Sequence, residues 1–364
     1  MRKCGASVLL TIGLLFALSS CGFKDIDNRF FIMAVGIDEG RHHKYEVSLM
    51  LAVPSPKPET GESKSQVISQ EADTIAEAVR RMKSVVDKEF DFGHAKVFVI
   101  GKSFIHHPDL LPSLNWIFRR RDIQQIAYMA LGEPDAKTVI STRPHSERHP
   151  GNSLLLAMSG DGTESPYIVT ETVFDFYRRN NAKGEDAYLP IVHASDRSLV
   201  VNRVAVLGRG SRRLELSPEE TETFNQLVRG YSLFIIKAPV EGQTVTFSVS
   251  KLNIRRRFAR PLSDTSEISF KVYAEADVED SPQHLYRTNW STLRQAVEEQ
   301  LQTRYTELLR KLQKHRLDPL GLGLHYRAIA HRGNDEFETW KKLYPDIAFH
   351  VRARVKIRST GIIE

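Results

Sequence analysis

The stretch Ile268-Ser-Phe-Lys-Val-Tyr-Ala-Glu-Ala-Asp-Val278 alternates apolar and polar residues. Side chains of a strand point to opposite faces in turn, so this alternation predicts a half-buried antiparallel strand. Residues 347–357 alternate in the same way and predict a second strand. Between them, residues 289–316 place apolar side chains on one helical stripe, which predicts a long amphipathic helix against the sheet. That stripe consists of Leu293, Val297, Leu301, Tyr305, Leu308 and Leu312.

The first half of the chain has shorter elements. We expect strands at 30–37, 45–53 and 96–100, and a helix from Asp73 or Thr74 to about Lys88. No βαβ rhythm and no dinucleotide fingerprint occur, so the predicted fold class is α+β, with mainly antiparallel sheets packed with helices. A break near residue 195 suggests domains at 21–195, possibly subdivided, and 196–364. Further helices are expected at 108–118, 134–140, 152–158 and 170–179.

Residues 1–20 have the order of a bacterial lipoprotein signal peptide. Arg2 and Lys3 form the positive region, Val8–Leu18 forms the apolar region, and Leu18-Ser-Ser-Cys21 places small residues before a cysteine. Cys21 is therefore predicted to be the lipid attachment site. An uncleaved anchor, or an ordinary signal peptide with a chance cysteine, is the alternative interpretation.

Composition limits the class of protein. The 364 residues include 51 Lys+Arg and 45 Asp+Glu, a formal charge of +6, which suits an anionic surface but is too weak to imply nucleic acid. The apolar run Val8–Leu18 is too short for a bilayer, which needs about 20 residues, and this excludes a polytopic membrane protein. Of the two cysteines, Cys4 lies in the predicted signal peptide and Cys21 would be acylated, so no disulfide is expected.

Catalytic and metal-binding motifs are weak, and we predict no catalytic residue, no metal and no cofactor. His145 and His149 have a helical zinc spacing, but Pro144 and Pro150 bracket them and indicate a loop. Ser248-Val-Ser-Lys251 matches the Ser-x-x-Lys of penicillin-binding enzymes by letters, whereas residues 244–252 are typical of a strand rather than the helix start that this chemistry needs.

The last predicted strand carries cations at alternate positions, and these form the candidate docking face for an acidic partner or lipid headgroups. Glu275 and Asp277 on a neighbouring strand could instead neutralise them, which would make the face a solvated surface. Arg119–Arg121 and Arg255–Arg257 add basic clusters elsewhere. The candidate face consists of His350, Arg352, Arg354, Lys356 and Arg358.

Several motifs, in order along the mature chain, resemble the Ger(x)C family of spore germination lipoproteins. They are Cys21 with Asp25-Ile-Asp-Asn-Arg29, Val35-Gly-Ile-Asp38, Asp91-Phe-Gly-His94 before an apolar strand ending at Gly101, Phe118-Arg-Arg-Arg-Asp-Ile123, Asp318-Pro-Leu-Gly-Leu-Gly323, Trp340-Lys-Lys, Tyr344-Pro-Asp346 and Ile357-Arg-Ser-Thr-Gly361.

The resemblance implies a non-catalytic C subunit of a nutrient germinant receptor, anchored by lipid on the outer face of the inner spore membrane. Its implied partners are the integral-membrane A-type and B-type receptor subunits. Whether it contacts the nutrient stays open. Two other classes stay open as well: a solute-binding lipoprotein of a transporter, which should show two parallel α/β lobes, and a lipid-tethered cell-wall enzyme, which would need a nucleophile or metal site.

Overall fold

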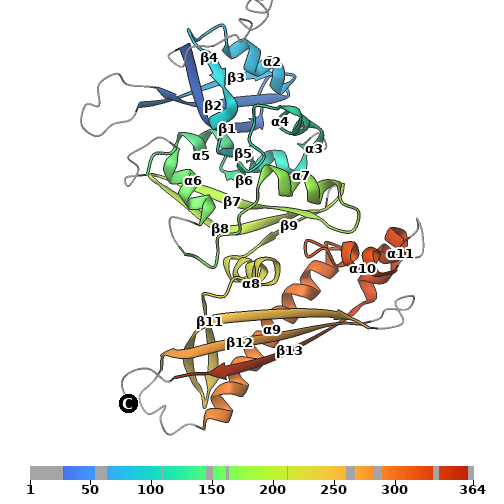
Figure 1. Ribbon diagram of the computed structural model, residues 1–364. Helices are drawn as coiled ribbons and strands as arrows, with labels where there is room; N and C mark the ends of the chain where they lie inside the picture. Colours follow the sequence, from blue (N-terminus) through green and yellow to red (C-terminus); the bar gives the residue numbers. More distant parts are fainter. Residues whose placement is uncertain are drawn as a thin grey trace, which may run out of the picture.

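The structure is a computed structural model that describes residues 28–53, 64–107, 110–144, 151–160, 164–210, 212–259, 267–281, 289–330 and 336–359. Two β-sheets lie at successive levels of an elongated molecule, with helices between and around them (Figure 1). This arrangement confirms the expected α+β class, with sheets packed against helices and a long helix on the C-terminal sheet.

The first sheet has nine strands in the order β3-β2-β1-β5-β6-β7-β8-β9, and β4 pairs with the start of β1. Its centre is parallel, because β1, β5, β6 and β7 run the same way, while the outer strands pair antiparallel. The strands are β1 Arg29–Glu39, β2 Tyr45–Val53, β3 Lys64–Ala72, β4 Glu89–Asp91, β5 Val97–Gly101, β6 Tyr128–Glu133, β7 Ala187–Ser195, β8 Ser198–Leu207 and β9 Arg213–Leu216.

Apolar side chains cover both faces of this sheet. On one face a cluster joins β1, β2 and β5 to α2 and α7, and on the other face a second cluster joins them to α5 and α6. Strands buried on both sides have continuous apolar runs rather than alternation, as in Val97–Gly101. The helices are α2 Ile75–Met82, α3 Leu110–Ser113, α4 Asn115–Arg119, α5 Ala136–Ser141, α6 Asn152–Ser159 and α7 Val173–Asn181.

The motif Val35-Gly-Ile-Asp38 joins β1 to α5. The side chain of Asp38 accepts hydrogen bonds from the backbone N–H groups of Ala136 (2.7 Å) and Lys137 (2.9 Å) at the start of that helix. Burial raises the pKa of Asp38 to about 6, against the opposing effect of these hydrogen bonds. A Cβ at residue 101 would lie 2.0 Å from Asp38 Oδ1, so Gly101 is required for this contact.

The second sheet has the order β10-β11-β12-β13, and α9 covers one of its faces (Figure 1). We expected this sheet to be antiparallel, but β13 pairs parallel to β12. The long helix explains the difference, because α9 crosses back over the sheet and returns the chain to the end where β12 began. These elements are β10 Phe234–Val240, β11 Gln243–Phe258, β12 Glu267–Asp280, α9 Trp290–Lys314 and β13 Ala348–Ile357.

Two expected helices differ in extent from the prediction. Thr74 caps α2 as expected, accepting from the N–H of Glu77 at 3.1 Å, but the helix ends at Met82 rather than near Lys88. The residues that follow, Ser84-Val-Val-Asp87, have low helix propensity. The predicted helix over 108–118 is divided into α3 and α4.

The two sheets share a core through α8, Pro218–Arg229, whose N-terminus is a capping box of Ser217 and Glu220. A single apolar cluster contains residues of β8, α8 and α9. Tyr305 of α9 also donates a buried hydrogen bond to Gln226 Oε1 of α8 at 2.7 Å. The expected boundary near residue 195 falls at the turn between β7 and β8, and the first sheet continues beyond it to Leu216.

Candidate functional site

The outer face of the C-terminal sheet carries the candidate docking residues. Along β13 the side chains of Phe349, Ala353 and Val355 are buried under α9 and its neighbours, while His350, Arg352, Arg354 and Lys356 are exposed. Arg358 follows the strand, and its backbone N–H donates to Ala276 O at 2.9 Å. Alternation along one strand therefore separates a core face from a cationic face.

Cross-strand register extends this cationic face over β11 and β12. Arg255 of β11 lies opposite Lys271 of β12, and Lys271 lies opposite Arg352 of β13, so three cations stand in one row. In the adjacent row, Asn253, Tyr273 and Arg354 are aligned. Like charges directly opposite each other oppose folding, so this row adds nothing to the stability of the sheet.

Carboxylates neutralise only the periphery of the face. Glu275 lies 3.2 Å from Lys251 Nζ, Asp277 pairs with Arg358, and Glu267 lies 3.6 Å from His350. The hydrogen bond from Arg358 holds the pKa of Asp277 below its ordinary value. Within the described ranges, no ion pair is formed by the cations in the middle of the face, Arg255, Lys271, Arg352 and Arg354, whereas Lys356 lies opposite Glu275 in the strand register.

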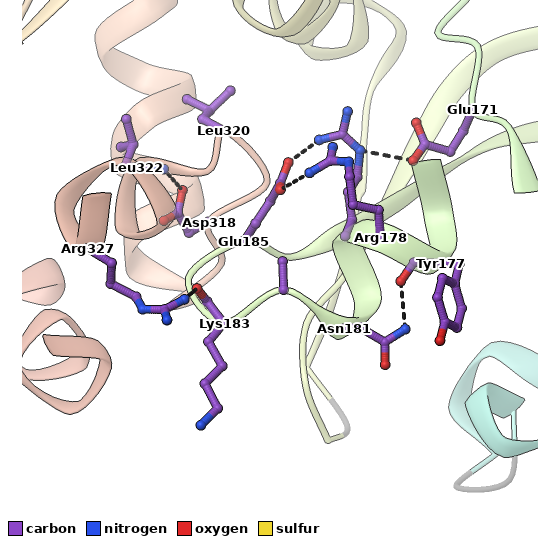
Figure 2. Close-up of polar contacts among 12 residues, drawn as sticks. Glu171, Tyr177, Arg178, Asn181, Lys183, Glu185, Asp318, Leu320, Leu322 and Arg327 are labelled. Atoms are coloured by element: carbon purple, nitrogen blue, oxygen red, sulfur yellow. Dashed lines mark hydrogen bonds and ion pairs between the residues drawn. The ribbon is translucent and has the colours of Figure 1, made fainter. Parts of the chain in front are cut away.

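A buried polar contact around Asp318 fixes the C-terminal helices against the first sheet. Figure 2 shows Asp318 with its bond to Leu322. Asp318 accepts from the backbone N–H groups of Leu322 (2.9 Å) and Gly323 (2.7 Å), where α10 (Leu322–Ala330) begins. Its own backbone N–H donates to Asp186 Oδ2 at 2.7 Å, just before β7. Burial raises the pKa of Asp318 to about 7.

An arginine network lies on the other side of this contact. Glu185 accepts from Arg178 Nη1 at 2.8 Å and from Arg179, and Arg179 Nε donates to Glu171 Oε1 at 2.9 Å (Figure 2). Burial raises the pKa of Glu171 to about 8, although the charge of Arg179 acts in the opposite direction. Arg327 of α10 donates to the carbonyl of Lys183 at 2.7 Å. Of these bonds, the one from Arg327 joins the C-terminal helices to the first part of the chain.

A cavity of about 330 Å³ lies beside this junction, between Arg209, Arg212 and the rings of Phe337 and Trp340 from α11 (Glu336–Leu343). The carboxylates on its wall are already hydrogen-bonded to main-chain N–H groups or arginines. Arg209 and Arg212 donate to main-chain carbonyls. The residues around the cavity therefore make structural contacts and do not form a nucleophile–base pair.

The weak motifs form no site within the described residues. Ser248 and Lys251 lie in strand β11, where Ser248 is opposite Asp277 and Lys251 is opposite Glu275, and not at a helix start. No group of three potential ligands that could hold a metal occurs in the described part of the chain. His145, His149 and Cys21 lie outside it. In the same part of the chain, no helix is both long and apolar enough to cross a bilayer.

The described residues thus define an α+β protein of two linked sheets, one covered on both faces and one with an open cationic face. Residues 22–194 match the family described as "Spore germination protein N-terminal domain", and residues 202–361 match "Spore germination B3/ GerAC like, C-terminal". The chain belongs to the Ger(x)C family of spore germination proteins.

Named relatives and a solved structure agree with this assignment. The chain is 20% identical to "Spore germination protein GerQC" of Bacillus cereus, over 84% of this chain and 85% of that protein. It is 20% identical to "Spore germination protein B3" of Bacillus subtilis, over 96% of each. The "Crystal Structure of the GerBC protein" has the same fold, with a TM-score of 0.51 and 18% identity, covering 89% of this chain and 96% of that one.

Proposed function

We propose that this chain is the lipid-anchored C subunit of a nutrient germinant receptor, which supports nutrient-triggered germination by binding integral-membrane A-type and B-type subunits and catalyses no reaction. Membership of the Ger(x)C family supports the receptor role. The signal-like residues 1–20 before Cys21 support attachment to the outer face of the inner spore membrane. Domains divided at 21–195 and 196–364 remain part of this proposal.

The cation row of the C-terminal sheet is the observation that carries the partner-binding role. Arg255, Lys271 and Arg352 lie side by side without carboxylate partners among the described residues. Such a row costs the folded state a little free energy, and an acidic surface on a partner would offset that cost. The docking face of His350, Arg352, Arg354, Lys356 and Arg358 is the edge of this larger cationic surface.

Loss of the acyl site tests the anchor. Cys21→Ala removes the proposed site of acylation, so we expect a folded protein that leaves the membrane fraction. The measurement is fractionation of spore extracts, with circular dichroism of the purified variant. A Cys21→Ala protein that still sediments with membranes would contradict lipid anchoring.

Charge reversal tests the docking face. We expect the triple variant Arg352→Glu, Arg354→Glu and Lys356→Glu to remain folded but to lose co-purification with the A-type and B-type subunits. The matched control reverses three exposed cations of α9 on the opposite side of the sheet, Arg294, Arg310 and Lys314. Equal loss in both variants, or unfolding of the first alone, would contradict a docking role for β13.

A further inference from the structure

The length of chain between the lipid and the first strand restricts which end of the protein meets the bilayer. This step rests on the proposed attachment at Cys21. Seven residues lead from Cys21 to Asn28, the first described residue, and a fully extended chain of that length reaches about 25 Å. The beginning of β1 must therefore lie within that distance of the acylated cysteine.

One turn lies directly beside the beginning of β1. Strand β4 pairs in parallel with the beginning of β1, so that Arg29 is opposite Glu89. The turn Lys83–Lys88 immediately precedes β4, and Lys88 Nζ lies 5.6 Å from the ring centroid of Phe30. Lys83 Nζ lies 3.0 Å from Glu89 Oε2. The turn and the point where the tether enters the fold therefore form one surface.

The tip of this turn is apolar and largely exposed to solvent. The side chain of Val85 is 75% exposed, the highest fraction among the large hydrophobic residues that the structure describes. Its backbone N–H donates to Met82 O at 3.1 Å, and Val86 packs partly buried on the core, so the tip is held in place. A single exposed valine is ordinary on a protein surface, and only its place beside the tether makes it informative.

Cations flank the apolar tip. Lys83 and Lys88 belong to the turn, together with the exposed Asp87. Lys83 is paired with Glu89, whereas Arg80 at the end of α2 is exposed and has no carboxylate partner in the described residues. An apolar residue between basic residues is the arrangement by which a segment lies in the headgroup region of an anionic membrane.

We propose that the turn Lys83–Lys88 faces the bilayer, with Val85 among the lipid headgroups and with Arg80 and Lys88 beside anionic phosphates. The cationic face of the second sheet lies at the other end of the molecule (Figure 1). Five strand spacings, about 24 Å, separate β1 from β9, and α8 lies beyond them. One end would contact lipid, and the other would be left for a protein partner.

Site-specific labelling tests this orientation on the acylated full-length protein. Since Cys4 is removed with the signal peptide and Cys21 carries lipid, Val85→Cys supplies a single free thiol for an NBD fluorophore. The matched control is Tyr273→Cys, 40% exposed at the middle of the cationic face. Both are bound to vesicles of equimolar phosphatidylethanolamine and phosphatidylglycerol that contain a headgroup spin-labelled lipid. We expect the lipid to quench NBD severalfold more at residue 85 than at residue 273.

The outcomes separate this proposal from the anchor on which it rests. Vesicle-bound protein with both labels unquenched, or with stronger quenching at residue 273, would overturn the orientation and leave the anchor standing. Acylated protein that does not float with vesicles would overturn the anchor, and the orientation with it. If Val85→Cys disturbs the fold by circular dichroism, Ser84→Cys on the same exposed turn replaces it with the same expectation.

Discussion

The two sheets differ in how many of their faces are covered. Helices pack on both faces of the nine-stranded sheet, so adjacent residues of β5 enter separate apolar clusters. The four-stranded sheet has α9 on one face only, and its other face is lined by cations. A sheet covered on both sides has no free face for a partner, whereas a sheet covered on one side leaves a broad and rigid surface exposed.

The carboxylates of the two sheets also differ in how deeply they are buried. Near the first sheet, Asp38 and Asp318 are buried, and both oxygens of each carboxylate accept hydrogen bonds from backbone N–H groups. On the second sheet, Glu275 and Asp277 are partly exposed and pair with the side chains of Lys251 and Arg358. Burial of a charge demands partners within the fold, and exposure does not. Unpaired charge therefore gathers where the chain can present it to another molecule.

The largest expected effects that test this difference between the two sheets are changes in the free energy of unfolding on truncation to alanine. In β5, Phe98→Ala should cost about 3–5 kcal/mol and Val99→Ala about 2 kcal/mol, because both adjacent side chains are fully buried. In β12, Phe270→Ala should cost about 3 kcal/mol, whereas Lys271→Ala should change stability by less than about 0.5 kcal/mol. Urea denaturation measures all four. A large cost at Lys271, or none at Val99, would refute the contrast.

Whether helices cover one face or both faces of a sheet also determined how well its strands could be predicted from sequence. Alternation located β12 and β13 to within two residues: 268–278 was expected against the observed Glu267–Asp280, and 347–357 against Ala348–Ile357. It also revealed the cations of β13. Strands of the covered sheet were harder to find, and β7, with Pro190 inside a continuous apolar run, was not recognised.

Long-range pairing could not be predicted. The parallel direction of β13 depends on how α9 crosses the sheet, and the row Arg255–Lys271–Arg352 depends on register across three strands. Asp318 and Asp186 are 132 residues apart, so only the folded chain reveals their contact. The cap pattern gave no signal either, because Asp318 accepts from Leu322, four residues on, which is one position beyond the reach of an N-cap side chain.

A second prediction concerns how the free energy of unfolding depends on pH. The folded protein holds a proton on Asp318 up to about pH 7, whereas the unfolded chain releases it near 3.8. More protons are bound to the folded state in that window, so stability should fall as pH rises from about 4 to 7, by at most about 1.4 kcal/mol per pH unit for this group. Asp38 and Glu171, whose pKa values burial also raises, add to the same slope.

Urea denaturation at several pH values measures that slope. Asp318→Asn should make it shallower between pH 4 and 7. The variant should still be less stable overall, because an NH2 group replaces one of the two oxygens that accept from Leu322 and Gly323. The matched change on the open face is Asp277→Asn. The pKa of Asp277 is lowered by Arg358, so this variant should alter the pH dependence only below about pH 4. An unchanged slope in Asp318→Asn would contradict the assignment of this pH dependence to Asp318.

The smallest expected effect has the opposite sign. Lys271→Glu should raise the free energy of unfolding by about 0.2–1 kcal/mol, because it replaces two like-charge neighbours, Arg255 and Arg352, with two opposite-charge pairs. Lys237→Glu on β10 is the control, since Lys237 is exposed and faces Thr246 rather than a cation, and it should give no gain.

Stability and partner binding should then separate in one variant. If the cation row serves an acidic partner, Lys271→Glu should be more stable than the natural protein and yet co-purify less with the A-type and B-type subunits. Equal co-purification with raised stability would leave the row without a binding role. A loss of stability would mean that the cation row contributes to folding. That result would contradict the view that the open face of the second sheet, unlike the covered faces, is not needed for stability.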